Sequence, residues 1–312
     1  MKKIPCRKSF TETLLELARQ DSSIIALASD SRGSVTLGDF ADALPEQFVE
    51  CGIAEQDEVG IAAGLAACGK KAFVCAPACF LSTRSLEQVK VDVAYSHTNV
   101  KVIGISGGIS YGALGMSHHS LQDVAVMRAI PGMTVILPAD EYQTREMTKA
   151  LVEFDGPVYV RMGRGAVDNV YTEEFAPFTI GKANQLTEGN DLAIIACGET
   201  VVQAYRAAKE LEKEGIGARV LDMHTIKPLD EEAVLAACRE CKAILTVEEA
   251  SPYGGLGEAV AHVAVQNHPV PMKIIGLPDE SLVSGTSAEL YAYYRLDTAG
   301  ILSSARELLN FK

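Results

Sequence analysis

The sequence lacks any apolar run of about 18 residues, which is the length that a membrane-spanning helix needs. Its start, MKKIPCRKSF, also lacks the apolar core of a secretion signal. The eight cysteines lie mainly in apolar stretches, which suits a reducing compartment better than a disulfide-stabilised secreted domain. We therefore expect a cytoplasmic protein that does not contact a membrane.

Basic residues are outnumbered. The chain of 312 residues has 28 Lys and Arg against 41 Asp and Glu, a formal net charge of -13, without long runs of one sign. Such a charge is unsuited to binding nucleic acid or an anionic lipid surface. We therefore exclude both from the expected partners.

Several common catalytic motifs are missing. No GxGxxG or GxxxxGK[ST] opens a helix after a strand, which argues against a Rossmann site and a P-loop. Residues 104–108, GISGG, approach the nucleophile elbow GxSxG without its spacing. The close cysteine pairs, Cys75 with Cys79 and Cys238 with Cys241, have no histidine or second pair at zinc spacing. The sequence therefore predicts no zinc site.

Short apolar, β-branched runs alternate with amphipathic segments along the chain, which is the pattern of parallel sheets covered by helices. The predicted strands are residues 24–29, 71–77, 100–106, 133–139, 157–162, 191–198, 218–223, 243–249 and 272–277. Helical periodicity fills the intervals between most of them. A stretch rich in Gly, Pro and charge interrupts the pattern midway. We predict two doubly wound α/β domains, residues 1–165 and 190–312, joined by a linker over residues 166–189.

One candidate functional residue stands in GIAEQDEVGIAAGLAACG, residues 52–69, where a carboxylate begins a helix of small residues. The first interpretation is electrostatic, because a carboxylate in a first helical turn interacts favourably with the helix dipole by about 0.3–1 kcal/mol. The second is functional, because small residues let another backbone or a flat ligand approach closely. A secluded carboxyl such as Glu55 can then share a proton with a ring nitrogen.

This segment resembles the pyrimidine-binding domain of thiamin-diphosphate enzymes, in the group of transketolase and 1-deoxyxylulose-5-phosphate synthase. The resemblance covers nearly the whole chain and rests on CRKSFTETL (6–14), GIAEQ to KVDVA (52–94), SHHSLQD to LPAD (117–140) and VLDMHT to GEAVA (220–261). It implies a pyrimidine-binding domain followed by a transketolase C-terminal domain. It also implies the β subunit of a two-component transketolase, which moves a two-carbon ketol unit from a ketose to an aldehyde through thiamin diphosphate.

The resemblance assigns roles to single residues. The glutamate that matches Glu55 hydrogen-bonds N1′ of the aminopyrimidine and promotes the tautomer that activates the cofactor. Phe80 matches the aromatic residue that stacks on that ring, and His118 matches a histidine beside the reacting carbonyl. Taken alone, Phe80 could be ordinary core and His118 an exposed loop residue. Further cofactor-binding positions implied by the resemblance are Asp30, Arg84 and Gln88.

Substrate binding is implied at Arg7, Ser34, Ser106, Leu114, His118 and Arg161. Of these, Arg7, Ser34 and Arg161 match residues that hold the phosphate of the sugar, and two forked guanidiniums with a hydroxyl suit such an anion. Leu114 replaces an Asp that reads a sugar hydroxyl, and Ser106 replaces a phosphate-contacting His. We therefore expect a sugar with different middle hydroxyls or a different terminal anion, such as a sulfonate or a branched phosphate.

The chain lacks the Gly-Asp-Gly motif through which the family holds the diphosphate and Mg²⁺. The resemblance therefore implies a partner, the N-terminal diphosphate-binding subunit, which supplies both and completes the active site, with α2β2 as the expected assembly. Two alternatives stay open. The chain could be the β subunit of a 2-oxoacid dehydrogenase, although SHHSLQD and CRKS favour the transketolase side, or it could be a non-catalytic interaction module.

Overall fold

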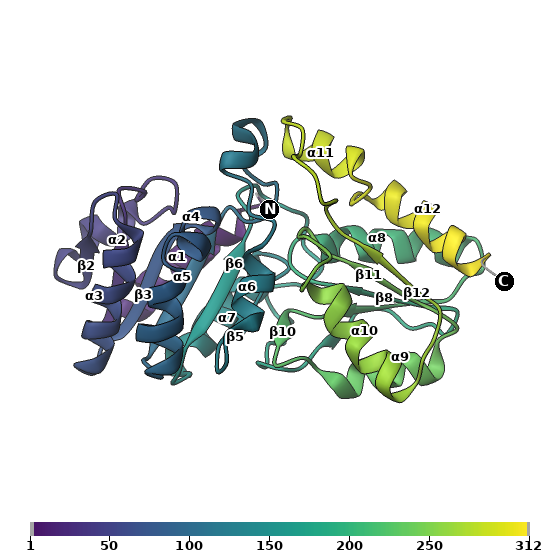
Figure 1. The fold of residues 1–312 in the computed structure, drawn as a ribbon, viewed down its shortest axis with the longest axis horizontal. Coiled ribbons are helices and arrows are strands. Elements are labelled where there is room, and N and C mark those ends of the chain that lie inside the picture. Colours follow the sequence, from purple (N-terminus) through teal and green to yellow (C-terminus); the bar gives the residue numbers. More distant parts are fainter. Residues whose placement is uncertain (1–2, 311–312) are drawn as a thin grey trace.

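The computed structural model describes residues 3–310, so the outermost ends of the two predicted domains lie outside it. Two α/β units lie side by side, each built on its own sheet (Figure 1). The predicted fold class, two α/β domains, is confirmed. Among the described residues, no helix combines the length and the apolarity needed to cross a membrane.

The first sheet has seven strands in the order β10-β5-β6-β4-β3-β1-β2. They are β1 (Ile24–Ala28), β2 (Phe48–Glu50), β3 (Lys71–Pro77), β4 (Val100–Ile105), β5 (Thr134–Ile136), β6 (Val158–Met162) and β10 (Thr225–Lys227). All pairs are parallel except β10 with β5. Strand β10 comes from the second half of the chain, so the second domain adds an edge strand to the first sheet. The sequence analysis did not predict this short strand, which ends at Pro228.

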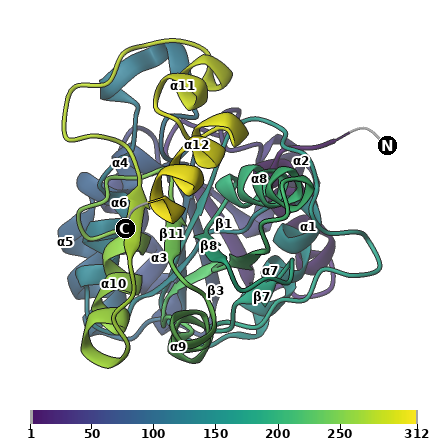
Figure 2. The same ribbon diagram turned by 90° about the vertical axis from the view of Figure 1, so that its right-hand side faces the viewer.

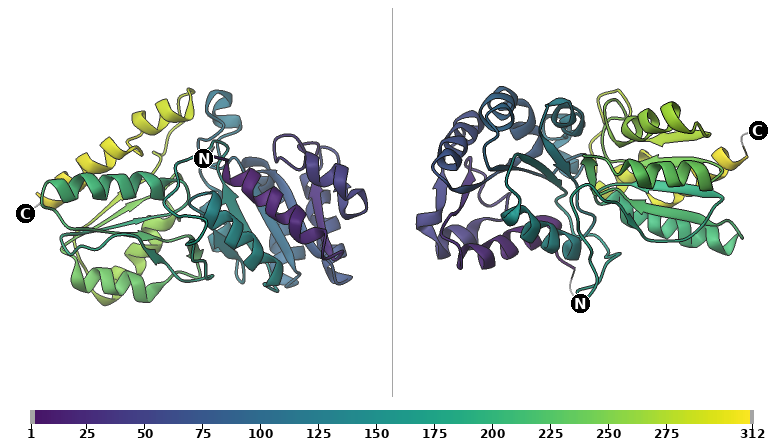
Figure 3. Two further views of the ribbon diagram at one scale, coloured as in Figure 1. Left: turned by 180° about the vertical axis from the view of Figure 1, so that it is seen from behind. Right: turned by 90° about the horizontal axis from the view of Figure 1, so that it is seen from below.

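Helices cover both faces of this sheet. They are α1 (Cys6–Ala18), α2 (Gly38–Ala43), η1 (Pro45–Gln47), α3 (Glu55–Ala67), α4 (Ala78–Thr83), α5 (Leu86–Gln88), η2 (Val89–Tyr95), η3 (Gly112–Ser117), α6 (Asp123–Ala129) and α7 (Glu141–Glu153). Helices α1 and α7 lie together on one face, the purple and teal helices in Figure 3, where Phe10 packs with Ile24. Val59 of α3 packs with Ile25 on the other face. Because neighbouring strand residues point to opposite faces, Ile24 and Ile25 serve different cores.

The second sheet has five strands in the order β12-β11-β8-β9-β7. They are β7 (Asn184–Gln185), β8 (Leu192–Ala196), β9 (Ala218–Asp222), β11 (Ile244–Val247) and β12 (Met272–Ile275). The helices are α8 (Thr200–Lys213), α9 (Glu231–Glu240), α10 (Leu256–Asn267), α11 (Ser287–Tyr293) and α12 (Thr298–Leu309). Helices α8 and α12 cover one face, and α9 and α10 the other (Figure 2). Strand β7 lies within the stretch predicted as a linker and pairs antiparallel with β9.

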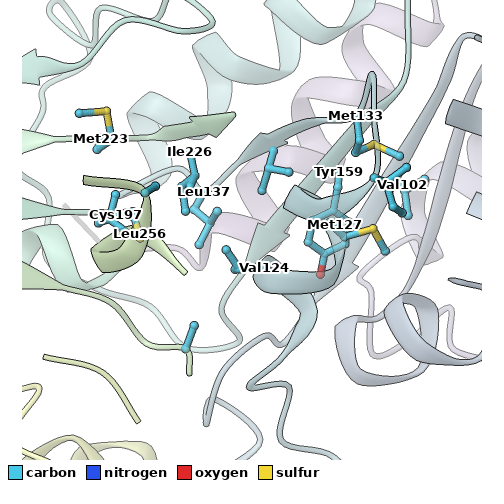
Figure 4. Packing of buried hydrophobic residues seen from close by; sticks show 14 of the residues in the cluster. Val102, Val124, Met127, Met133, Leu137, Tyr159, Cys197, Met223, Ile226 and Leu256 are labelled. Carbon is cyan, nitrogen blue, oxygen red and sulfur yellow. The ribbon is translucent and has the colours of Figure 1, made fainter. Parts of the chain in front are cut away.

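A continuous apolar core joins the two domains. Leu137, just after β5, belongs to the same buried cluster as Cys197 and Ile226 of the second domain (Figure 4). The backbone N–H of Leu137 also donates to the carbonyl of His224 at 2.7 Å. The two domains therefore pack through core as well as surface contacts, which fixes the groups at their junction relative to one another.

Candidate active site

The predicted site residues gather at the carboxyl ends of the first sheet's strands. Asp30 follows β1, Phe80 follows β3 and Ser106 follows β4, while Glu55 begins α3 directly after β2. In open parallel sheets this edge is where loops and helix starts meet and where ligands bind. The fold thus brings together residues that lie far apart in the sequence.

Glu55 is the first residue of α3, and its side chain is only 6% exposed. Arg84, which follows α4, donates from Nη1 to Glu55 Oε1 at 2.8 Å. The same guanidinium lies over the ring of Phe80, with Cζ 4.0 Å from the ring centroid. One carboxylate oxygen of Glu55 is therefore held by Arg84, and Oε2 has no hydrogen bond within residues 3–310.

A second acid, Glu58, lies one helical turn beyond Glu55 and is fully buried. Its carboxylate accepts hydrogen bonds from the hydroxyl of Ser29 and, at 3.1 Å, from the backbone N–H of Cys75. Burial raises the pKa of Glu58 to about 7. Glu58 therefore ties α3 to the ends of β1 and β3. The sequence analysis missed it, although its spacing of three from Glu55 places both acids on one helix face.

Aromatic side chains continue the site from Phe80. The ring of His118 stands edge-on to Phe80 with centroids 5.2 Å apart, and Tyr111 stands edge-on to His118 at 5.1 Å. His118 Nδ1 lies 2.9 Å from the hydroxyl of Ser117. The neighbouring His119 is buried instead, with Nε2 3.1 Å from the carbonyl of Gly112, and burial lowers its pKa. Of the two histidines, His118 is thus the one that faces Phe80.

The far end of the site carries two arginines. The guanidinium of Arg164 lies 4.9 Å from the ring centroid of Tyr111. Arg7 donates from Nε to the carbonyl of Arg164 at 3.1 Å and from Nη1 to the carbonyl of Ser34. Nη1 of Arg164 is buried without a hydrogen-bond partner in the described chain. We call Arg7 and Arg164 the anion clamp, because two neighbouring guanidiniums with a free donor suit a tetrahedral oxyanion.

Arg161 does not lie in the anion clamp, contrary to the sequence prediction. Its side chain is 4% exposed, and Nη2 donates to the backbone carbonyl of Glu249 at 2.6 Å. The carboxylates of Asp123 and Glu249 lie 3.7 and 3.6 Å from its nitrogens. Arg161 therefore joins the two domains, and Arg164, three residues later, takes the place predicted for it. The sequence VRMGR could not distinguish the two arginines, because neither periodicity nor charge separates them.

Ser34 and Ser106 also differ from simple expectation. Ser34 offers its backbone carbonyl to Arg7, rather than a hydroxyl to the anion. Ser106 is fully buried, has a φ of 60° and keeps its hydroxyl without a partner among residues 3–310. A positive φ at a serine is strained and is typical of functional loops. The next residue must be glycine, because a Cβ on Gly107 would lie 2.1 Å from Arg161 Nε.

The remaining predicted residues lie around this row. Asp30 is exposed with a φ of 50°, and its N–H donates to a carboxylate oxygen of Glu50 at 2.7 Å. Leu114 is 54% exposed in η3. Gln88 lies in a groove between α3 and η2, and it has no hydrogen bond to Glu55 or Phe80 in the described part of the chain. Their roles at the cofactor and substrate stay predictions.

Taken in order, the contacts form an unbroken row from a buried carboxylate, through aromatic rings and an imidazole, to two guanidiniums. Its members are Glu55, Arg84, Phe80, His118, Tyr111, Arg164 and Arg7. Such a row can hold a proton at one end, stack a flat ring beside it and bind a small molecule that ends in an anion. Three members or neighbours, Tyr111, Arg164 and Glu58, were not found from the sequence.

Comparisons with known proteins agree with this arrangement. Residues 2–169 match the family described as transketolase, pyrimidine binding domain, and residues 181–301 match transketolase, C-terminal domain. One of the two subunits of apulose-4-phosphate transketolase from Phocaeicola vulgatus is 60% identical over 306 residues, with 98% of both chains covered. The SqwH chain of the 6-deoxy-6-sulfo-D-fructose transketolase from a Clostridium species is 40% identical, with 98% of this chain and 95% of the relative covered.

A solved structure described as a split-gene transketolase, inactive β4 tetramer, has a TM-score of 0.91 and 37% identity to this chain, with 99% of both chains covered. Both halves of the chain thus match, in order, the two domains of one enzyme family, and relatives of similar length are separate subunits. This protein therefore belongs to the transketolase family, as a chain of the kind that split transketolases carry as their separate β subunit.

Proposed function

We propose that this subunit contributes the cofactor-activating acid and the substrate's anion-binding end to a transketolase active site that a partner subunit completes. The observation that supports this most directly is the contact row from Glu55 to the anion clamp. It places acid–base chemistry and anion recognition at opposite ends of one row, as transfer of a ketol unit from an anionic sugar requires.

The residues present fit thiamin diphosphate. Glu55 is a buried carboxylate with Oε2 unpaired among residues 3–310, and the half-buried ring of Phe80 lies beside its partner Arg84. When bound, the cofactor supplies the carbon nucleophile and electron sink for ketol transfer. Glu55 would hold a proton at Oε2 against the pyrimidine ring, Phe80 would contact the ring, and Arg84 would keep the carboxylate oriented through Oε1.

The chain's other residues act on the substrate. His118 would donate or accept a proton at an oxygen beside the reacting carbonyl, because its Nε2 has no hydrogen bond in the described structure while Nδ1 is held by Ser117. Arg7 and Arg164 would bind the terminal anion and so orient the sugar. The buried Glu55 and the packed loops around His118 would limit the access of water.

A partner subunit is needed for the diphosphate and the metal. Within residues 3–310, no three histidine, cysteine or acidic side chains are grouped to hold a metal ion. We infer that Mg²⁺ and the diphosphate are bound mainly by an N-terminal transketolase subunit, in an α2β2 assembly. A precedent for a β chain without activity is the related split-gene transketolase described as an inactive β4 tetramer.

The substrate is proposed to be a ketose that ends in a phosphate or a sulfonate. Leu114 presents no hydrogen-bonding group to a sugar hydroxyl, whereas the anion clamp is intact. The relatives named above act, by their names, on apulose 4-phosphate and on 6-deoxy-6-sulfo-D-fructose. These two sugars are therefore the first to test as donors.

The test is reconstitution. The chain is co-expressed with a candidate Gly-Asp-Gly subunit and assayed with Mg²⁺, thiamin diphosphate, each donor and an aldehyde acceptor. We expect transfer by the complex and none by either chain alone. Glu55→Gln should lower kcat by about 10²–10⁴-fold, the range of general acid–base catalysis. Glu16→Gln, an exposed acid on α1, is the matched control. Full turnover in Glu55→Gln, or transfer by one chain alone, would reject the proposal.

A further inference from the structure

Glu199 belongs to the second domain but lies beneath the anion clamp of the first. It directly precedes α8, and its largely buried carboxylate lines the small cavity at the domain junction together with Arg161, Gly163 and Glu249. Its Oε1 has no hydrogen-bond partner within the described chain. Neither the proposed chemistry nor the sequence analysis uses this residue.

The contacts of Glu199 fall on the residues that directly precede the two clamp arginines. Its carboxylate interacts with the backbone N–H of Gly163, which precedes Arg164, and with the thiol of Cys6, which precedes Arg7. The fit against Gly163 leaves no space, since a Cβ there would lie 2.1 Å from Glu199 Oε2. A single carboxylate thus touches both chain segments from which the clamp projects.

The charged surroundings of Glu199 come from four elements. Cys6 and Arg7 belong to α1, Arg161 to β6, Glu249 to the segment after β11, and Tyr291 to α11. Burial, and then the charge of Glu249, raise the pKa of Glu199 to about 8 in spite of Arg161. Arg161 compensates it incompletely, because it also faces Asp123 and Glu249. The charge of Glu199 also acts on Arg7.

We propose that Glu199 is a positioning residue of the anion clamp, through which the second domain sets the placement of Arg7 and Arg164. By holding the backbone at positions 6 and 163, it keeps the two guanidiniums adjacent. This inference rests on the proposed function only for the identity of the substrate, because the clamp can be probed with an inorganic anion.

A consequence is a pH dependence of anion binding that runs through one residue. Near pH 7 Glu199 is mostly neutral, so it does not reduce the positive potential of the clamp. Above about pH 8 it ionises next to Arg7 and weakens the attraction for an anion. A Gln at this position stays neutral and keeps the shape of the side chain.

The experiment measures sulfate binding to the chain by isothermal titration calorimetry between pH 6.5 and 9, because sulfate keeps its charge over this range. We expect Arg164→Ala to abolish binding and Glu199→Ala to weaken it about tenfold at pH 7. Glu199→Gln should bind within twofold of wild type at pH 7 and should lack the threefold or greater loss of affinity that wild type shows by pH 9. Glu188→Gln, an exposed acid, is the control.

Kinetics of the reconstituted complex supply the second measurement. Glu199→Ala should raise KM for the anionic ketose about tenfold while kcat stays within twofold, whereas a purely structural lesion would lower kcat as well. The inference fails if Arg164→Ala or Glu199→Ala binds sulfate as wild type does, or if Glu199→Gln keeps the wild-type pH profile. A reconstituted complex without ketol transfer, alongside the expected sulfate data, would count against the proposed function and leave this inference supported.

Discussion

Replacing Arg161 tests the assignment of this arginine to the domain junction instead of the anion clamp. In Arg161→Met the stem is retained, but Asp123 and Glu249 lose their cation, and the carbonyl of Glu249 loses its donor. Both acids are buried, at 0% and 7% exposure, so water cannot replace the guanidinium. Although burial alone would lower it, these two carboxylates raise the pKa of Arg161.

The expected cost follows from the distances. A charge pair at 3.6 Å, the separation of Arg161 from Glu249, is worth about 4.5 kcal/mol at an effective dielectric constant of about 20. Desolvation offsets much of this attraction, and breaking a buried pair by removing one partner typically costs about 3–5 kcal/mol. At about 2–4 °C per kcal/mol for domains of this size, the melting temperature should fall by about 6–15 °C.

The assay is urea unfolding followed by circular dichroism, with Arg239→Met, an exposed arginine on α9, as the control. Folded Arg161→Met should still bind sulfate within about threefold of wild type, because its guanidinium does not reach the anion. A loss of stability below about 1 kcal/mol, or loss of sulfate binding from a folded variant, would refute the placement of Arg161.

Three further substitutions test other parts of the site. Tyr111→Phe removes the hydroxyl of the ring between His118 and Arg164, and should raise KM for the ketose about three- to tenfold in steady-state assays while leaving sulfate affinity unchanged. Gly107→Ala should destabilise the chain by about 2 kcal/mol or more in urea, because its Cβ would overlap Arg161. Glu58 has a folded pKa raised to about 7, so wild type should lose stability as pH rises from about 4.5 to 7, by at most about 3 kcal/mol. Glu58→Gln should flatten that slope in unfolding measured at pH 5 and pH 8.

The sequence by itself determined most elements of the fold. Strands such as β3 and β8 are unbroken apolar runs, and helices such as α3 and α8 carry apolar residues at helical spacing, so their positions follow from local pattern. It also placed Glu55 at a helix start and distinguished the pyrimidine-binding segment by resemblance. These features depend on residues that are close together in the chain.

Only the tertiary structure decided which distant residues meet. Arg161 and Arg164 are equivalent as sequence, yet β6 turns the first into the domain junction and leaves the second beside Tyr111. Strand β10 joins the first sheet, and Glu199 reaches Gly163, through packing between segments far apart in the chain. Local periodicity carries no information about such pairings, because they arise from how the two domains share one core and from which charges that core must neutralise.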